Sequence, residues 1–135
     1  MNKKIDHIAF AVKNLTSSAK LFEKLFNIRS SKTEIVKEEN VKIKFLQLAQ
    51  SKIELLEGIG EDNAISKFIK KNGEGIHHVA IEVNNINQEI ERLKNEGFKI
   101  VNDKLSKGAN NKLIAFLHPK QTSGVLIEIC QKIKK

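Results

Sequence analysis

Two segments of the chain, DHIAFAVKNL at residues 6–15 and HHVAIEVNNI at residues 77–86, repeat one pattern. In each segment, bulky apolar residues alternate with a second set that contains a histidine and then a small alanine. These are His7 and Ala9 in the first segment, and His78 and Ala80 in the second. Because side chains alternate across a strand, each segment predicts a strand with one bulky apolar face and one face of small residues around a histidine. A chain with this repeat is expected to fold as two similar modules.

The same order of elements is predicted after each repeated strand. An asparagine, Asn14 or Asn85, can cap a helix, and apolar residues then recur at helical spacing. Short β-rich runs follow at residues 33–36, 41–48 and 52–56 in the first module, and at 99–101, 113–117 and 124–129 in the second. A third helix over residues 64–71, with Asn63 as its cap, joins the two. The sequence therefore predicts an α+β fold made of two tandem βαβββ modules.

The length of 135 residues is sufficient for about one domain with a buried core. We predict a single domain over residues 1–135. Module 1 is expected at about residues 5–58, the linker helix at about 63–72 and module 2 at about 76–131.

Composition and charge limit the functions that the chain can have. It is 40% hydrophobic and 30% charged, as soluble proteins are, so we expect no membrane segment. The absence of an apolar h-region after Met1, together with Cys130 as the single cysteine, predicts a cytoplasmic protein. The net charge of +8 comes mainly from dispersed lysines, and every aromatic residue is Phe, which argues against nucleic-acid binding. The charge favours a small anionic ligand.

The last predicted strand of each module carries a glutamate, Glu54 in SKIELLE and Glu128 in GVLIEIC. The residues beside each glutamate are apolar and would point to the opposite face, which places the carboxylates on the histidine face. For one glutamate alone, a salt bridge on an edge strand is an alternative. Four imidazole and carboxylate ligands suit a divalent metal and leave two of six positions open. We therefore predict His7, Glu54, His78 and Glu128 as metal ligands, with His77 on the other face.

The paired modules and the order His, Glu, His, Glu resemble the vicinal oxygen chelate superfamily, which includes glyoxalases, bleomycin resistance proteins and dioxygenases. Within it, GEGIHHVAIEV at residues 73–83, FLHPK at 116–120 and GVLIEICQ at 124–131 look like the methylmalonyl-CoA epimerases. The likeness extends from Asp6 to Gln131. This resemblance implies a cupped eight-stranded mixed sheet around a metal site, and a homodimer.

The resemblance also implies an activity. It is the epimerisation of (2R)- and (2S)-methylmalonyl-CoA, a CoA thioester, by proton abstraction at C2 through a metal-stabilised enolate. One divalent metal ion per chain is expected, with cobalt favoured and manganese, nickel or zinc as alternatives. By position, the family's metal ligands fall on His7, His78 and Glu128, and Glu54 falls where members supply Gln or Glu. Glu128 is the first candidate for the catalytic acid or base and Glu54 is the second.

One departure from the family concerns the second acid or base. Some members have a separate glutamate on the strand that corresponds to residues 41–48, where this chain has Lys42, Lys44 and Gln47 but no carboxylate. The identity of the second group therefore stays open. Gln47 could hydrogen-bond the substrate or could simply be the polar end of a strand.

Other functions and other site residues also fit the sequence. A glyoxalase-like lyase or isomerase would use similar ligands and a similar enediolate. A non-catalytic small-molecule binding or resistance module would hold its ligand without turnover. Lys112 and Lys120 could contact the phosphates or carboxylate of a CoA ester, or could be solvated surface residues.

Overall fold

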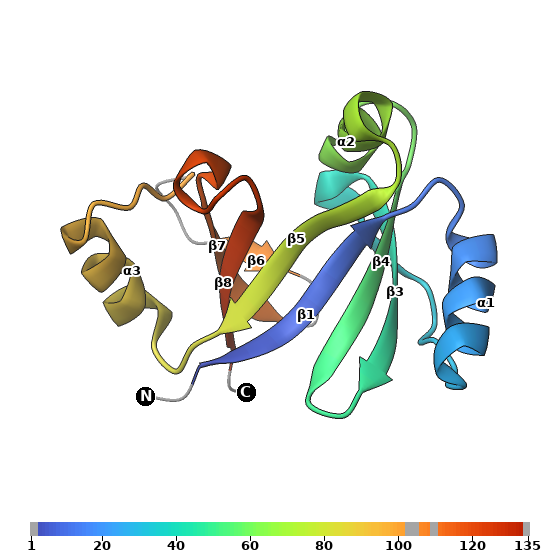
Figure 1. The fold of residues 1–135 in the computed structure, drawn as a ribbon, viewed down its shortest axis with the longest axis horizontal. Coiled ribbons are helices and arrows are strands. Elements are labelled where there is room, and N and C mark those ends of the chain that lie inside the picture. The colour runs from blue at the N-terminus through green and yellow to red at the C-terminus, as the bar shows by residue number, and fades with distance from the viewer. Residues whose placement is uncertain (1–2, 102–105, 109–110, 134–135) are drawn as a thin grey trace. The chain divides into compact units, whose positions relative to one another are not determined.

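The computed structural model describes residues 3–101, 106–108 and 111–133. The chain separates into two compact units. The N-terminal unit is His7–His77, and the C-terminal unit is Met1–Asp6 together with His78–Lys135. The described residues contain eight strands and three α-helices, in the order βαβββ, linker helix, βαβββ (Figure 1). The predicted α+β class and the repeated order of elements are therefore confirmed.

The N-terminal unit contains a mixed arrangement of strands in the order β2-β3-β4-β1. Strand β1 pairs in parallel with β4, whereas β3 is antiparallel to both β2 and β4. The bounds of its elements are β1 (Lys4–Ala11, of which the residues from His7 onward belong to this unit), α1 (Leu15–Phe26), β2 (Glu34–Val36), the 3-10 turn η1 (Lys37–Glu39), β3 (Val41–Leu48), β4 (Ser51–Gly58) and α2 (Ala64–Asn72).

The bulky faces of β1, β3 and β4 pack against α1, as the alternating pattern predicts. Helix α1 lies beside β3 and β4 (Figure 1). Leu46 of β3 and Leu55 of β4 are fully buried, and Leu15 and Ala19 of α1 pack against them. Because β4 alternates, Glu54 lies on the opposite face from Leu55. The helix-covered core thus leaves Glu54 on the opposite face of the strands.

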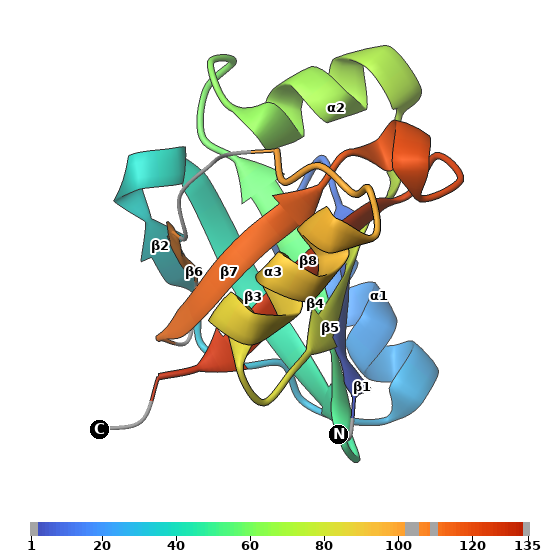
Figure 2. The same cartoon turned by 90° about the vertical axis from the view of Figure 1, so that its left-hand side faces the viewer.

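The C-terminal unit repeats this architecture, with strands in the order β5-β8-β7-β6. Strand β5 is parallel to β8, and the β8–β7 and β7–β6 pairs are antiparallel. Helix α3 packs against β8 through an apolar core (Figure 2). The bounds are β5 (Gly75–Glu82, which begins in the N-terminal unit), α3 (Ile86–Asn95), β6 (Ser106–Gly108), β7 (Lys112–Leu117), the 3-10 turn η2 (Pro119–Gln121) and β8 (Leu126–Lys132).

The predicted strand over residues 99–101 is wrong. Ile100 makes an isolated bridge to Leu117, and its side chain packs into the core under α3. The strand at this place in the module is Ser106–Gly108, a short polar run whose composition has no strand signal. No helix in the described part of the chain is long and apolar enough to cross a membrane.

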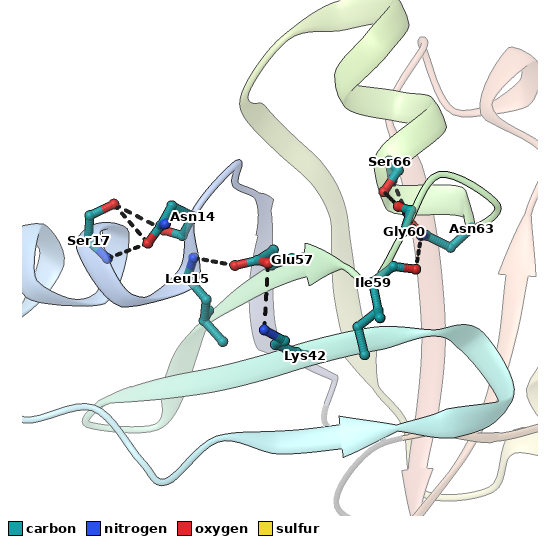
Figure 3. A network of polar contacts seen from close by, with 9 residues as sticks. All are labelled: Asn14, Leu15, Ser17, Lys42, Glu57, Ile59, Gly60, Asn63 and Ser66. Atoms are coloured by element: carbon teal, nitrogen blue, oxygen red, sulfur yellow. Dashed lines mark hydrogen bonds and ion pairs between the residues drawn. The ribbon is translucent and has the colours of Figure 1, made fainter.

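All three predicted asparagine caps are present. Oδ1 of Asn14 accepts a hydrogen bond from the Ser17 amide at 2.9 Å (Figure 3), and Oδ1 of Asn85 accepts one from the Gln88 amide at 3.1 Å. Asn63 also accepts from Ser66 at 2.7 Å, and its amide nitrogen donates to the carbonyls of Ile59 and Gly60, both at 3.1 Å (Figure 3). Asn63 therefore fixes both the start of α2 and the loop that precedes it.

Replacement of Asn63 by alanine is expected to lower the free energy of unfolding by about 2 kcal/mol, at the upper end of the range for a lost N-cap. Asn63 is buried, and its loss would leave three backbone groups without their side-chain partner. Asn14→Ala, at an exposed cap, should cost about 1 kcal/mol. Urea unfolding of both variants measures the difference, and equal losses would show that the extra hydrogen bonds of Asn63 contribute little.

Candidate metal and catalytic site

In the N-terminal unit, His7 and Glu54 form a buried pair. The parallel register of β1 and β4 sets Ala9 beside Glu54 and so places His7 on the same face, one alternation away. The His7 Nε2 atom lies 3.7 Å from the Glu54 Oε2 atom, and the two residues are only 4% and 5% exposed.

In the C-terminal unit, His78 and Glu128 form the corresponding pair. Strands β5 and β8 are also parallel, with Ala80 beside Glu128. The His78 Nε2 atom lies 3.3 Å from the Glu128 Oε1 atom, and both residues are buried. Phe116 of β7 pairs with Glu128 of β8. Its ring meets the imidazole of His78 edge to face, with ring centroids 5.7 Å apart. The sequence repeat therefore corresponds to one local geometry that occurs once in each unit.

The geometry of each pair fits two ligands of a common metal ion. Separations of 3.7 and 3.3 Å are longer than a good N–H···O hydrogen bond, which is about 2.9 Å. They lie within the range, about 3–4 Å, that separates two atoms bound some 2.1 Å from one ion. A buried carboxylate needs a compensating cation or donor, and imidazole with carboxylate is a donor set for cobalt, manganese, nickel or zinc.

The two adjacent histidines point in different directions, as the alternation predicts. His78 is 5% exposed and faces Phe116. His77 is half-buried and stacks edge to face against Phe68 of α2, with ring centroids 5.1 Å apart. The proposed ligand and its neighbour therefore have different surroundings.

Lys112 is not the solvated or ligand-binding lysine that the sequence suggested. It is 3% exposed, and its Nζ atom makes a short contact with the Asp6 carboxylate, which is also buried. Burial disfavours the ammonium, but the hydrogen bond and charge of Asp6 outweigh that effect and raise the pKa of Lys112. Lys120, in contrast, is exposed.

The buried pair leads to a stability prediction. Lys112→Met should lower the free energy of unfolding by about 3–5 kcal/mol, because it leaves the Asp6 carboxylate buried without its cation. The double variant Asp6→Leu with Lys112→Met should recover most of that loss, since neither position then holds an unpaired buried charge. Chemical denaturation tests this coupling, and a double variant less stable than Lys112→Met would contradict it.

Gln47 is the polar strand end that the sequence left as an alternative. Its side-chain amide donates to the carbonyls of Ala49 at 2.8 Å and Ser51 at 3.3 Å, and so closes the β3–β4 turn. The carboxylates nearest in sequence to β3 are Glu38 and Glu39, in the 3-10 turn that precedes it. Both side chains are exposed.

The structure defines the surroundings of two further residues, Cys130 of β8 and Lys52 of β4. Cys130 is fully buried, and burial together with the charge of Glu128 raises the pKa of its thiol to about 12, so the thiol is inert. Sequence reasoning also missed Lys52, whose ammonium lies 5.1 Å from the centroid of the Phe45 ring. The signal for Lys52 was its position two residues before Glu54, which places it on the same face.

The fold and the donor set agree with the matches to known proteins. The chain belongs to the glyoxalase/bleomycin resistance protein/dioxygenase superfamily, whose family model matches residues 6–116. It is 35% identical over 129 residues to the human mitochondrial methylmalonyl-CoA epimerase, and this alignment covers 95% of this chain and 73% of the human protein.

Two solved structures of methylmalonyl-CoA epimerases are also similar. A single-substitution variant of the Streptomyces coelicolor enzyme, in complex with 2-nitronate-propionyl-CoA, superposes with a TM-score of 0.90 at 30% identity, over 96% of this chain and 94% of that one. A methylmalonyl-CoA epimerase in complex with methylmalonyl-CoA and an ammonium ion superposes with a TM-score of 0.91 at 29% identity, over 98% and 96%.

Proposed function

We propose that this protein is a metal-dependent methylmalonyl-CoA epimerase that interconverts the (2R) and (2S) forms of its substrate. The observation that carries the proposal is the buried His–Glu pair that recurs in each unit. It occurs in a chain similar over nearly its whole length to epimerases. Epimerisation needs a proton acceptor on one side of a carbon and a donor on the other, and the repeat supplies two equivalent carboxylates.

We propose that His7, Glu54, His78 and Glu128 hold one divalent ion, with cobalt favoured. All four residues are buried, and imidazole nitrogens and carboxylate oxygens are suitable ligand atoms for such an ion. In this proposal the two modules form one domain over residues 1–135, with a cupped eight-stranded mixed sheet around the ion. Such an ion would supply Lewis-acid stabilisation of negative charge on the thioester and carboxylate oxygens of the substrate.

The protein's own residues then carry the proton. Glu128 is the proposed acid or base on one side of C2 and Glu54 the proposed partner on the other. Phe116 and Phe45 pair with these glutamates across the neighbouring strands. Their rings would limit the access of water to the proton that is transferred.

We also propose a substrate class, a compartment and an oligomeric state for the protein. The substrate is a CoA thioester, the compartment is the reducing cytoplasm, and two copies form a homodimer. The dimer is supported by Leu21 and Leu25, which leave an apolar strip of α1 exposed at 62% and 66%. Sedimentation at micromolar concentration tests the dimer, and a monomer alone would remove it.

Turnover of two substrates tests the proposed function against its main rival. The metal-loaded protein should interconvert the methylmalonyl-CoA epimers and should leave the glutathione adduct of methylglyoxal unchanged. The reverse preference would assign a glyoxalase-like activity. Tight binding of a ligand without turnover of either substrate would indicate a binding or resistance module.

A further inference from the structure

On the strand face that carries His7 and Glu54 in the N-terminal unit there is also a lysine, Lys52. We propose that Lys52 recognises the free carboxylate of the substrate and thereby selects malonyl-type acyl-CoA thioesters over acyl-CoA thioesters without that carboxylate. This inference rests on the proposed function, because it concerns how that site chooses its substrate.

The register of three strands places Lys52 beside the pair. In the parallel β1–β4 ladder Lys52 lies opposite His7, and in the antiparallel β3–β4 ladder Phe45 lies opposite Glu54. Residues opposite one another in a ladder share a face, and so do residues two apart on one strand. His7, Lys52, Glu54 and Phe45 therefore lie on one face.

The ammonium of Lys52 lies over the ring of Phe45, which is on the same face of the strands as Glu54. Its backbone lies in the row of His7, but its Nζ atom is 5.1 Å from the ring centroid of Phe45, which lies in the row of Glu54. Lys52 is half-buried, so the ring contact costs little desolvation and holds the ammonium on the face that carries His7 and Glu54. A lysine has three donors and can bind an anion while it keeps a cation–π contact.

Three other polar side chains on β3, those of Lys42, Lys44 and Gln47, make contacts away from the His7–Glu54 pair. The Lys42 Nζ atom lies 3.8 Å from the Glu57 Oε2 atom (Figure 3). Oε1 of Glu57 also accepts a hydrogen bond from the amide of Leu15, the first residue of α1. Lys44 donates to the Ser31 carbonyl at 3.2 Å, and the ladder places it opposite Leu55 on the α1 face. The Gln47 amide closes the β3–β4 turn. Of the three lysines on these strands, Lys52 is the one on the histidine face.

The second unit differs at this position. There the residue opposite His78 is Leu126 rather than a lysine. The two units therefore share the His–Glu pair, but only the N-terminal unit has a lysine opposite the histidine. A substrate with a carboxylate on one side of its reacting carbon and a thioester on the other is asymmetric in the same way.

The experiment compares two ligands that differ by one carboxylate. Calorimetry on the cobalt-loaded protein measures the affinity for methylmalonyl-CoA and for propionyl-CoA. Lys52→Met should weaken methylmalonyl-CoA binding by about 10-fold or more, the usual effect of a lost charge-assisted hydrogen bond. Propionyl-CoA binding should change less than about twofold, because that ligand has no carboxylate for Lys52 to contact. Lys52→Arg should retain most of the preference, and Lys44→Met, on the other face, should leave both affinities unchanged.

Two results would overturn the inference while the proposed function stands. One is unchanged methylmalonyl-CoA affinity in Lys52→Met, and the other is an equal loss for both thioesters, which would place Lys52 against the CoA portion or in a structural role. If the wild-type protein binds neither thioester, the proposed function fails and the inference fails with it. Should Lys52→Met not fold, Lys52→Gln provides the same comparison.

Discussion

Alanine at His78 is expected to weaken cobalt binding by more than about 100-fold, because loss of a ligand costs more than the roughly 10- to 100-fold typical of losing a group that hydrogen-bonds a ligand. Alanine at His77 should change the cobalt affinity by less than about threefold, well below the effect of losing a group that hydrogen-bonds a ligand. The two residues are adjacent in sequence, but His78 lies 3.3 Å from Glu128, whereas His77 packs against Phe68. Isothermal titration of each variant with cobalt measures the difference.

The comparison includes its own control, since the two variants remove the same side chain from the same strand. Both variants also lose a ring contact, to Phe116 for His78 and to Phe68 for His77, so unfolding curves should be recorded in parallel. A larger loss for His77→Ala, or no loss for either variant, would contradict the assignment of ligands by strand face.

Glutamine at Glu128 is expected to reduce epimerase turnover by about 10³-fold or more, within the range for loss of a general acid or base. The change keeps the size of the side chain but removes a basic oxygen from a residue proposed as both ligand and base. Glu54→Gln should lose much less if Glu54 is mainly a ligand, because an amide oxygen can still coordinate a metal. Steady-state rates with both epimers, together with metal content, separate the two effects.

Comparable losses in the two variants would support the proposed roles of the two glutamates on opposite sides of C2, whereas a much smaller loss in Glu54→Gln would leave Glu54 as a ligand alone. Near-normal turnover in Glu128→Gln with full metal content would remove Glu128 from the proton transfer.

The faces of the strands and the helix caps could be predicted from sequence because they depend on local rules. Alternation assigned His78 to the face of small residues and His77 to the other, and the spacing of apolar residues placed α1 on the bulky side. Asn14 was recognised as a cap because its side chain serves amides only three residues away.

Features that depend on distant contacts could not be predicted in this way. Lys112 looked solvated because nothing near it in the sequence indicates that Asp6, more than 100 residues away, neutralises it. Gln47 looked available because the turn that uses its amide forms only when β3 and β4 pair. The strand Ser106–Gly108 has no apolar alternation, so its pairing with β7 gave no sequence signal.

The most direct test of the central proposal is proton exchange at C2 in deuterium oxide. The cobalt-loaded protein should introduce solvent deuterium at C2 of either methylmalonyl-CoA epimer while it inverts the configuration, and removal of the metal should stop both processes. Mass spectrometry and chiral analysis of the same samples measure exchange and inversion together. Absence of exchange with cobalt, manganese, nickel and zinc in turn, from a folded protein that binds these ions, would contradict the proposal.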